Sequence, residues 1–107
     1  EGFAFRYIAA DDFGKPKNAF TICTFWLIDA MYLSGDKQEA IKMFENLIKN
    51  ANHLGLFSED INPKTKELSG NFPQAYTHLA LINTAVLLSS DSLRRPVCDI
   101  RLELFKQ

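Results

Sequence analysis

The sequence has no excess of charge of either sign. It contains 12 Lys and Arg residues against 13 Asp and Glu residues, so its formal net charge at pH 7 is -1. A chain without a positive excess has no field with which to gather phosphate groups. We therefore expect no nucleic-acid partner.

Cysteine and histidine are also scarce. Cys23 and Cys98 are far apart and lack the spacing of metal ligands, and His53 and His78 are likewise distant in sequence. We expect free thiols, a hydrogen-bonded His78, and neither a catalytic metal nor another cofactor. Free thiols suit a reducing compartment, which predicts a cytoplasmic protein.

No long hydrophobic run is present. The most apolar stretch, residues 19–33, is interrupted by Thr21, Thr24 and Asp29, which makes it too short and too polar to span a membrane. A polar segment precedes it, which argues against a signal peptide. We expect no membrane partner.

The composition is that of a folded domain. Of the 107 residues, 47% are hydrophobic and 23% charged, and nine are Phe. This length suits one small domain or a piece of a larger one. The chain begins at Glu1 and not at a methionine, which predicts a processed or excised chain.

The first helical pattern covers residues 19–34. Apolar side chains fall on nearly every face of it, which is typical of a helix enclosed by protein on most sides. Trp26 lies on this pattern, and we expect it to pack in the core. Gly35 follows where a helix ends most easily, because glycine adopts positive φ without strain.

The second pattern covers residues 36–54 and is one-sided. Its apolar residues recur at spacings of three and four, and its charged residues form a wet face. Asp36 and Glu39 have the spacing of a capping box at its start, and Gly55 follows its end. These features predict an amphipathic helix.

The third pattern, residues 72–90, is again apolar on nearly every face. Asn71 is its predicted N-cap, with Pro73 in the first turn. A loop of about fifteen residues precedes it, and loops of that length are often functional. A short last helix is expected at residues 97–105, and no segment alternates as a strand would. Enclosed and amphipathic helices in alternation suit a two-layer ring of helices.

Three sequence stretches also carry a family resemblance. In chain order they are RYIAADDFGKPKNAFTICTFWLIDAMYLSG, HLGLFSEDINPKTKELSG and GNFPQAYTHLALI. Together they resemble the family-15 glycoside hydrolases, the glucoamylase group that includes glucodextranases and some bacterial trehalases. The resemblance covers residues 3–88. It implies an all-α fold in which residues 1–107 are the C-terminal portion of an (α/α)6 barrel, with about three or four of its helices.

The resemblance also implies a chemistry. Family members hydrolyse α-glucosidic bonds from a chain end with inversion, one carboxyl group protonating the leaving oxygen while a second takes a proton from water. Glu59 matches this general base, and we expect Ser58 and nearby backbone amides to hydrogen-bond its charged form. Asp60 is expected to be a bystander. The general acid matches no residue here, so the isolated chain is expected to be nearly inactive.

Four further residues are candidates for substrate binding. Arg6 matches a family arginine that contacts sugar hydroxyls, and the alternative is a surface ion pair with Asp11 or Asp12. These two acids lie near a family aspartate, and the spacing leaves open which of them corresponds to it. Tyr7, beside Arg6, is a candidate pocket residue.

Three functions stay open at this point. The leading one is a glucoamylase-like hydrolase acting on an α-glucan or oligosaccharide, and the second is a trehalase-type hydrolase of the same family acting on trehalose. The third is a stand-alone helical interaction or oligomerisation module, which a reading frame extending several hundred residues upstream would count against. For all three functions we expect the fragment to self-associate through exposed apolar helix faces.

Overall fold

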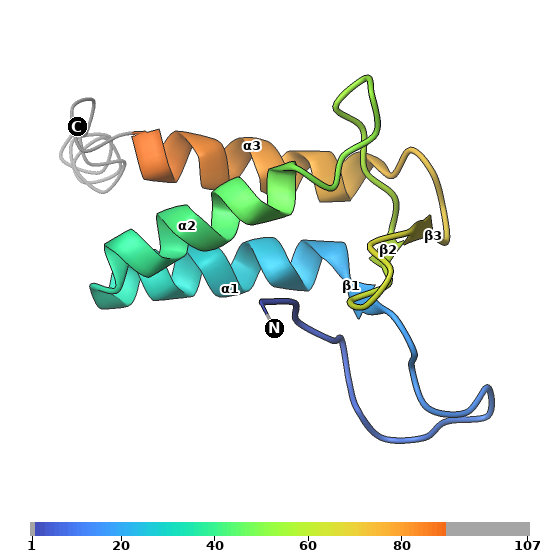
Figure 1. The fold of residues 1–107 in the computed structure, drawn as a ribbon. Helices are drawn as coiled ribbons and strands as arrows, with labels where there is room; N and C mark the ends of the chain where they lie inside the picture. Colours follow the sequence, from blue (N-terminus) through green and yellow to red (C-terminus); the bar gives the residue numbers. More distant parts are fainter. Residues whose placement is uncertain (1, 90–107) are drawn as a thin grey trace, which may run out of the picture.

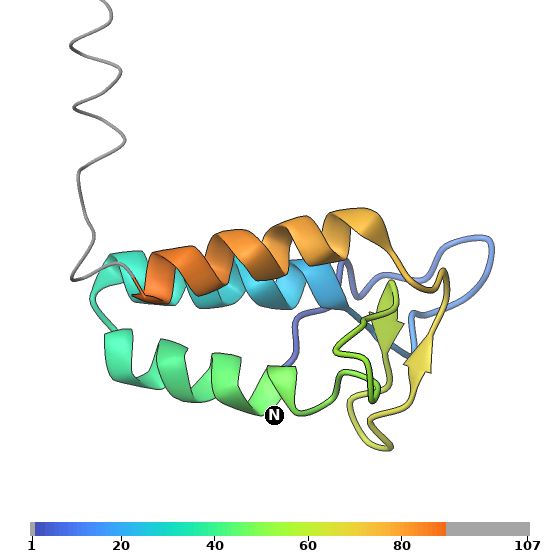
Figure 2. The ribbon, with the colours of Figure 1, turned by 90° about the horizontal axis from the view of Figure 1, so that it is seen from above.

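The computed structural model describes residues 2–89, which form three helices and a small sheet (Figure 1). Helix α1 packs against both α2 and α3, and the sheet lies at the end where α1 begins (Figures 1 and 2). This mostly helical architecture confirms the predicted fold class. The helix expected at residues 97–105 lies outside the described residues, as does Cys98. In chain order the elements are β1 (Ala19–Phe20), α1 (Thr21–Ser34), α2 (Lys37–Ile48), β2 (Asp60–Ile61), β3 (Leu68–Ser69) and α3 (Ala75–Ser89).

Helix α1 follows β1 without a loop and ends at Gly35. Gly35 has a φ of 111°, a left-handed conformation that a side chain would disfavour. Its N–H donates to the carbonyl of Tyr32, and the N–H of Asp36 donates to the carbonyl of Met31. The predicted glycine end of this helix is confirmed.

Helix α2 is amphipathic, as predicted, but it is shorter than its sequence pattern. The side-chain oxygen of Asn52 accepts the N–H groups of Leu54 and Leu56, so the chain turns where the helix would have continued. At the other end, Asp36 is the N-cap residue but its side chain makes no capping hydrogen bond. The predicted capping box is wrong, because Asp36 has a ψ of 49°, outside the extended conformation that aims a cap side chain at the helix.

Helix α3 begins four residues after the predicted cap. The carbonyl of Asn71 accepts the N–H of Glu59 at 2.8 Å, and the N–H of Gln74 donates to the carbonyl of Phe57 at 3.2 Å. The carbonyl of Asn71, which at an N-cap would accept the first bond of the helix, therefore bonds the loop that carries Glu59 instead. The prediction of a cap at Asn71 is wrong for this reason.

The sheet has three antiparallel strands in the order β1-β2-β3. Phe20 pairs with Asp60, and Asp60 pairs in turn with Ser69. The expectation that no segment forms a strand is wrong. Each strand has only two residues, too few for the alternation that reveals a strand in a sequence.

The core joins the loop of Glu59 to the helices. Phe57, two residues before Glu59, is 1% exposed and packs edge-on against Phe25 of α1, with ring centroids 5.8 Å apart. Phe44 of α2 also packs against Phe25, with ring centroids 6.2 Å apart. This packing anchors the loop on rigid elements, as a precise site requires. The other buried members of the cluster are Ile22, Ile28, Tyr32, Ala40, Leu47 and Ala80.

Two helices keep apolar faces that nothing in residues 2–89 covers. Trp26 of α1 is 57% exposed, and Leu79, Ile82 and Val86 of α3 are each more than half exposed. The expectation that Trp26 packs in the core is therefore wrong for this part of the chain. The pattern of an enclosed helix is present on α1 and α3 without the neighbours that would enclose them.

No helix among the described residues is long and apolar enough to cross a membrane. Cys23 is a free, half-buried thiol on α1, and burial raises its pKa.

Candidate active site

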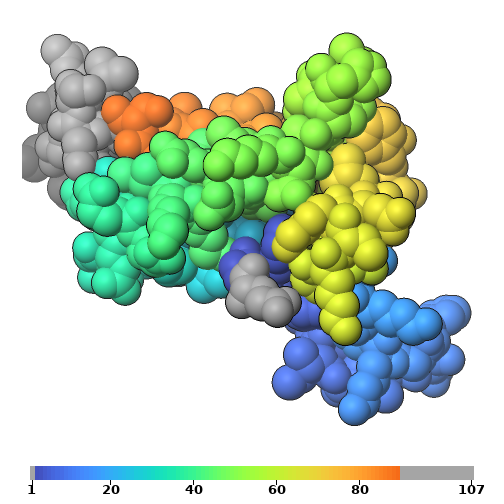
Figure 3. All heavy atoms as spheres, in the orientation of Figure 1, coloured from blue at the N-terminus to red at the C-terminus, as the bar shows by residue number. Residues whose placement is uncertain are grey.

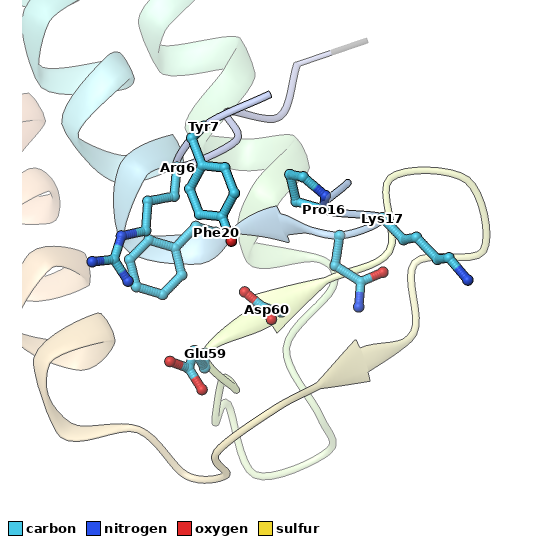
Figure 4. A pocket seen from close by; sticks show the side chains of 8 residues that line it. Arg6, Tyr7, Pro16, Lys17, Phe20, Glu59 and Asp60 are labelled. Atoms are coloured by element: carbon cyan, nitrogen blue, oxygen red, sulfur yellow. The ribbon is translucent and has the colours of Figure 1, made fainter. Parts of the chain in front are cut away.

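A pocket of about 260 Å³ lies where the loop before β1 meets the start of β2. The loop extends from the body of the molecule beside the sheet (Figure 3). Glu59 and Asp60 lie on one side of the pocket, and Arg6, Tyr7 and Phe20 lie on the other (Figure 4). The remaining lining residues are Pro16, Lys17 and Asn18.

The backbone of Glu59 is fixed on both sides. Its N–H donates to the carbonyl of Asn71 at 2.8 Å, and its carbonyl accepts the N–H of Thr21, the first residue of α1, at 2.9 Å. Glu59 therefore links the start of one long helix to the segment that leads into another. Its half-buried side chain extends from this junction and lines the pocket.

The carboxylate of Glu59 is held through one oxygen. Its Oε2 accepts the backbone N–H of Asn71 at 3.2 Å and the side-chain Nδ2 of Asn71 at 2.9 Å. Within residues 2–89 no donor bonds Oε1. One oxygen is thus fixed while the other is free to meet a water molecule.

Gly70 lies against this carboxylate. Its φ is 77°, and a Cβ built on it would lie 3.0 Å from Oε2 and 3.1 Å from the Cβ of Glu59. Such contacts are tighter than most real Cβ contacts, so a side chain at this position would push the Glu59 side chain aside. Glycine therefore suits both the positive φ and the close approach.

Ser58 has a different role from the one expected. Its fully buried hydroxyl donates to the carbonyl of Asp60 and accepts the N–H of Ser69 at 3.1 Å. It does not bond the Glu59 carboxylate, because it stabilises the β2–β3 pairing instead. A backbone amide does bond the Glu59 carboxylate, as expected, and it is the amide of Asn71.

Asp60 lines the pocket beside Glu59. Its partial burial, and then the negative charge of Glu59, raise its pKa. The sequence predicted Asp60 to be a bystander, since the family position beside the base is not itself an acid or a base in the reaction. The structure brings both acids to one pocket.

Arg6 also lines the pocket, with its guanidinium carbon 5.6 Å from the centre of the Phe20 ring. The alternative ion pair is not formed, as no ion pair in residues 2–89 joins Arg6 to Asp11 or Asp12. Stacking leaves the forked donors of the guanidinium available for a ligand.

Tyr7 and Asp11 form a pair at the edge of the pocket. The Tyr7 hydroxyl and the N–H of Phe13 bond the Asp11 carboxylate, and in that order they lower its pKa. The same pairing raises the pKa of Tyr7. Tyr7 lines the pocket, whereas Asp11 and Asp12 are not among the lining residues.

The described histidines are not arranged as metal ligands. His78 accepts the N–H of Phe57 on Nε2 at 3.1 Å, and its Nδ1 lies 2.6 Å from the carbonyl of Gln74. Nε2 therefore acts as an acceptor, and Nδ1 carries a proton that it donates to the carbonyl of Gln74. The prediction of a hydrogen-bonded His78 is confirmed. Within residues 2–89 no three His, Cys, Asp or Glu side chains cluster as a metal site would require.

Comparison with known proteins places this pocket in a family. The family model described as "Glycosyl hydrolases family 15" matches residues 4–86, and these include every residue that lines the pocket. The chain belongs to this family. The helices α1, α2 and α3 thus form part of the (α/α)6 barrel by which family 15 is known. No solved structure matches the chain significantly.

Several relatives are named trehalases. The chain is 41% identical over 96 residues to a trehalase of Thermoplasma acidophilum, 42% identical over 89 residues to one of Mycolicibacterium smegmatis, and 40% identical over 89 residues to one of Mycobacterium tuberculosis. These alignments cover 80 to 89% of this chain but only 13 to 16% of the relatives. The aligned part of the chain therefore spans about one sixth or less of the length of these relatives.

Sequence reasoning missed the part of Asn71 and Gly70 in this family-15 site. Both belong to the stretch GNFPQA, where Asn71 resembled a helix cap and Gly70 the end of a loop. Their proximity to Glu59 depends on a β2–β3 hairpin whose strands left no pattern.

Proposed function

We propose that residues 1–107 are the C-terminal part of the catalytic barrel of an inverting α-glucoside hydrolase that acts on trehalose. The single observation that carries this is the Glu59 carboxylate, bonded through one oxygen and directed into a pocket shared with Arg6. The relatives named trehalase support trehalose as the substrate over a longer α-glucan.

Glu59 has the features of a general base. In an inverting mechanism the base removes a proton from water on the face of the sugar opposite the leaving group. The two N–H donors of Asn71 hold one carboxylate oxygen of Glu59 and leave the other to accept this proton. Arg6 would bond sugar hydroxyls with its free donors and so orient the ring toward that water.

Asp60 is not proposed as the general acid. An inverting pair needs two carboxyl groups about 6.5 to 9.5 Å apart on opposite faces of the sugar. Glu59 and Asp60 are adjacent residues on the same side of the pocket (Figure 4). The acid then belongs to a facing wall supplied by polypeptide outside residues 1–107.

The small size of the pocket supports the proposal that a second wall, with the general acid, comes from polypeptide outside residues 1–107. Ligand pockets usually measure about 300 to 1,000 Å³ and enclose most of their ligand. The pocket here has about 260 Å³ and is built from the loop before β1 and from the start of β2. Because the general acid is absent from this wall, turnover by the isolated chain should be lower by about 100-fold to 10,000-fold or more. The isolated chain is therefore expected to be nearly inactive.

The test uses the complete polypeptide that carries these residues. Glu59→Gln removes the base with little change in volume, and we expect kcat on trehalose to fall by about 100-fold or more while KM changes little. Glu45→Gln, at an exposed position on α2, is the matched control and should keep full activity. A Glu59→Gln enzyme with normal turnover would refute the assignment of the base.

Two further readouts separate the parts of the proposal. Proton NMR of the first products of trehalose should show β-glucose and α-glucose in equal amounts, because water inverts the carbon that it attacks while the leaving glucose keeps its α configuration. Parallel assays on trehalose and maltooligosaccharides identify the substrate. Faster hydrolysis of maltooligosaccharides would replace trehalose by an α-glucan and leave the role of Glu59 standing.

A further inference from the structure

We infer that Asn71 is the positioning residue of the general base and that it selects Oε1 of Glu59 as the atom that takes the proton. The inference rests on the proposed role of Glu59. It goes further, because it names the group that fixes the base and the oxygen that reacts.

The first support is the direction of the hydrogen bonds. Both donors of Asn71 end on Oε2, at 3.2 and 2.9 Å, and neither reaches Oε1. A carboxylate bonded twice through one oxygen cannot rotate without losing both bonds, which are strong because the acceptor is charged. The second oxygen is thereby held in a constant position toward the pocket.

The second support is that Asn71 is itself fixed by the residue it holds. Its carbonyl accepts the N–H of Glu59 at 2.8 Å, so the two residues are joined by three hydrogen bonds. Both therefore move together with the start of α1, to which the carbonyl of Glu59 is bonded. A base located this way keeps its distance to the water, and a misplacement of about 1 Å can cost about 100-fold in rate.

The third support is the close approach of the backbone at Gly70. The Cβ that any other residue would carry there would press on the Glu59 side chain at 3.0 to 3.1 Å. Glycine at this position lets the N–H of Asn71 reach Oε2 without displacing the Glu59 side chain. Gly70 and Asn71 thus act as one unit, the first allowing the approach and the second supplying the donors.

The variants separate the side-chain donor from shape. Asn71→Asp has the same shape but presents oxygens to the carboxylate, Asn71→Ala removes the donor, and Asn71→Ser keeps a short donor. All three retain the backbone N–H at 3.2 Å, so the loss should be partial. In the complete polypeptide we expect kcat to fall by about 10-fold to 100-fold for Ala, more for Asp and less for Ser, with KM within about twofold.

Controls and a double mutant distinguish positioning from folding. Asn46→Asp, on the exposed face of α2, should keep both kcat and Tm. If Asn71 acts through Glu59, Asn71→Ala should lower kcat no further in a Glu59→Gln background. Gly70→Ala, which displaces the carboxylate by a different route, should resemble Asn71→Ala.

Each outcome decides one point. Full activity of the Asn71 and Gly70 variants, with Glu59→Gln inactive, would overturn this inference and leave the proposed function intact. Full activity of Glu59→Gln would overturn the proposed function first. A lower kcat accompanied by a higher KM and a lower Tm would assign Asn71 a structural role only. Losses in kcat that add up in the double mutant would do the same.

Discussion

At the scale of single residues, the two adjacent acids differ in what surrounds them. Glu59 faces two donors of Asn71, which stabilise a carboxylate, whereas burial and the charge of Glu59 raise the pKa of Asp60. The carboxyl group of Asp60 therefore stays protonated to a higher pH than that of an exposed aspartate. A carboxyl group with a shifted pKa inside a pocket is a frequent feature of functional sites.

The raised pKa of Asp60 predicts a dependence of stability on pH. Because the folded state favours the protonated form, the stabilisation is present below the ordinary value of 3.8 and is lost as pH rises through the raised value. Asp60→Asn should therefore increase the free energy of unfolding at pH 7, by at most about 1 kcal/mol because solvent screens a half-exposed carboxylate.

Urea denaturation of the chain at pH 3 and pH 7 measures this difference. The variant should match the parent at pH 3 and exceed it at pH 7. Asp12→Asn, at an exposed position outside the pocket, is the control and should change neither value. A lower stability of Asp60→Asn at pH 7 would contradict the sign of the effect.

At the scale of elements, α3 is joined to the loop of Glu59 by one imidazole. His78, in the first turns of α3, accepts the buried N–H of Phe57 and bonds the carbonyl of Gln74. The N–H of Gln74 returns to the carbonyl of Phe57. These hydrogen bonds fix Phe57 relative to α3, and so they help to position Glu59 two residues later.

Replacing His78 tests that link. His78→Phe keeps a ring but leaves the N–H of Phe57 without its acceptor, which should cost about 1 to 3 kcal/mol of unfolding free energy. His53→Phe, at an exposed turn, should change it by about 0.5 kcal/mol or less. Urea denaturation of both variants supplies the comparison, and equal stabilities would show that the His78 bond contributes nothing.

At the scale of the whole molecule, residues 2–89 form part of a larger layer of helices. Helix α1 contacts α2 on one side and α3 on another, yet Trp26 and three residues of α3 stay largely exposed. Such contiguous apolar faces usually seek a partner. The trehalases compared with this chain are more than six times longer than the segments that align with it, and we expect further helices to cover these faces. The cytoplasmic location stays a prediction.

The isolated 107-residue chain should therefore self-associate. We expect light scattering to show species larger than a monomer at concentrations of about 100 μM, because apolar surface is removed from water on association. Ile82→Lys combined with Val86→Lys should shift the chain toward monomer by placing charges on the exposed face of α3. Leu54→Lys, at an exposed turn outside α3, should not. A monomer at all concentrations for the parent chain would refute the prediction.

The sequence by itself determined the helices, the end of α1 at Gly35 and the family, because these depend on local periodicity, a local conformational demand and matching motifs. It also singled out Glu59 and Arg6, which the structure brings to one pocket. Only the tertiary structure decided that Asn71 bonds Glu59, that Asp60 enters the pocket and that Asn71 starts no helix. Those features arise from pairing between distant segments through two-residue strands, and such pairing leaves no periodic pattern in a sequence.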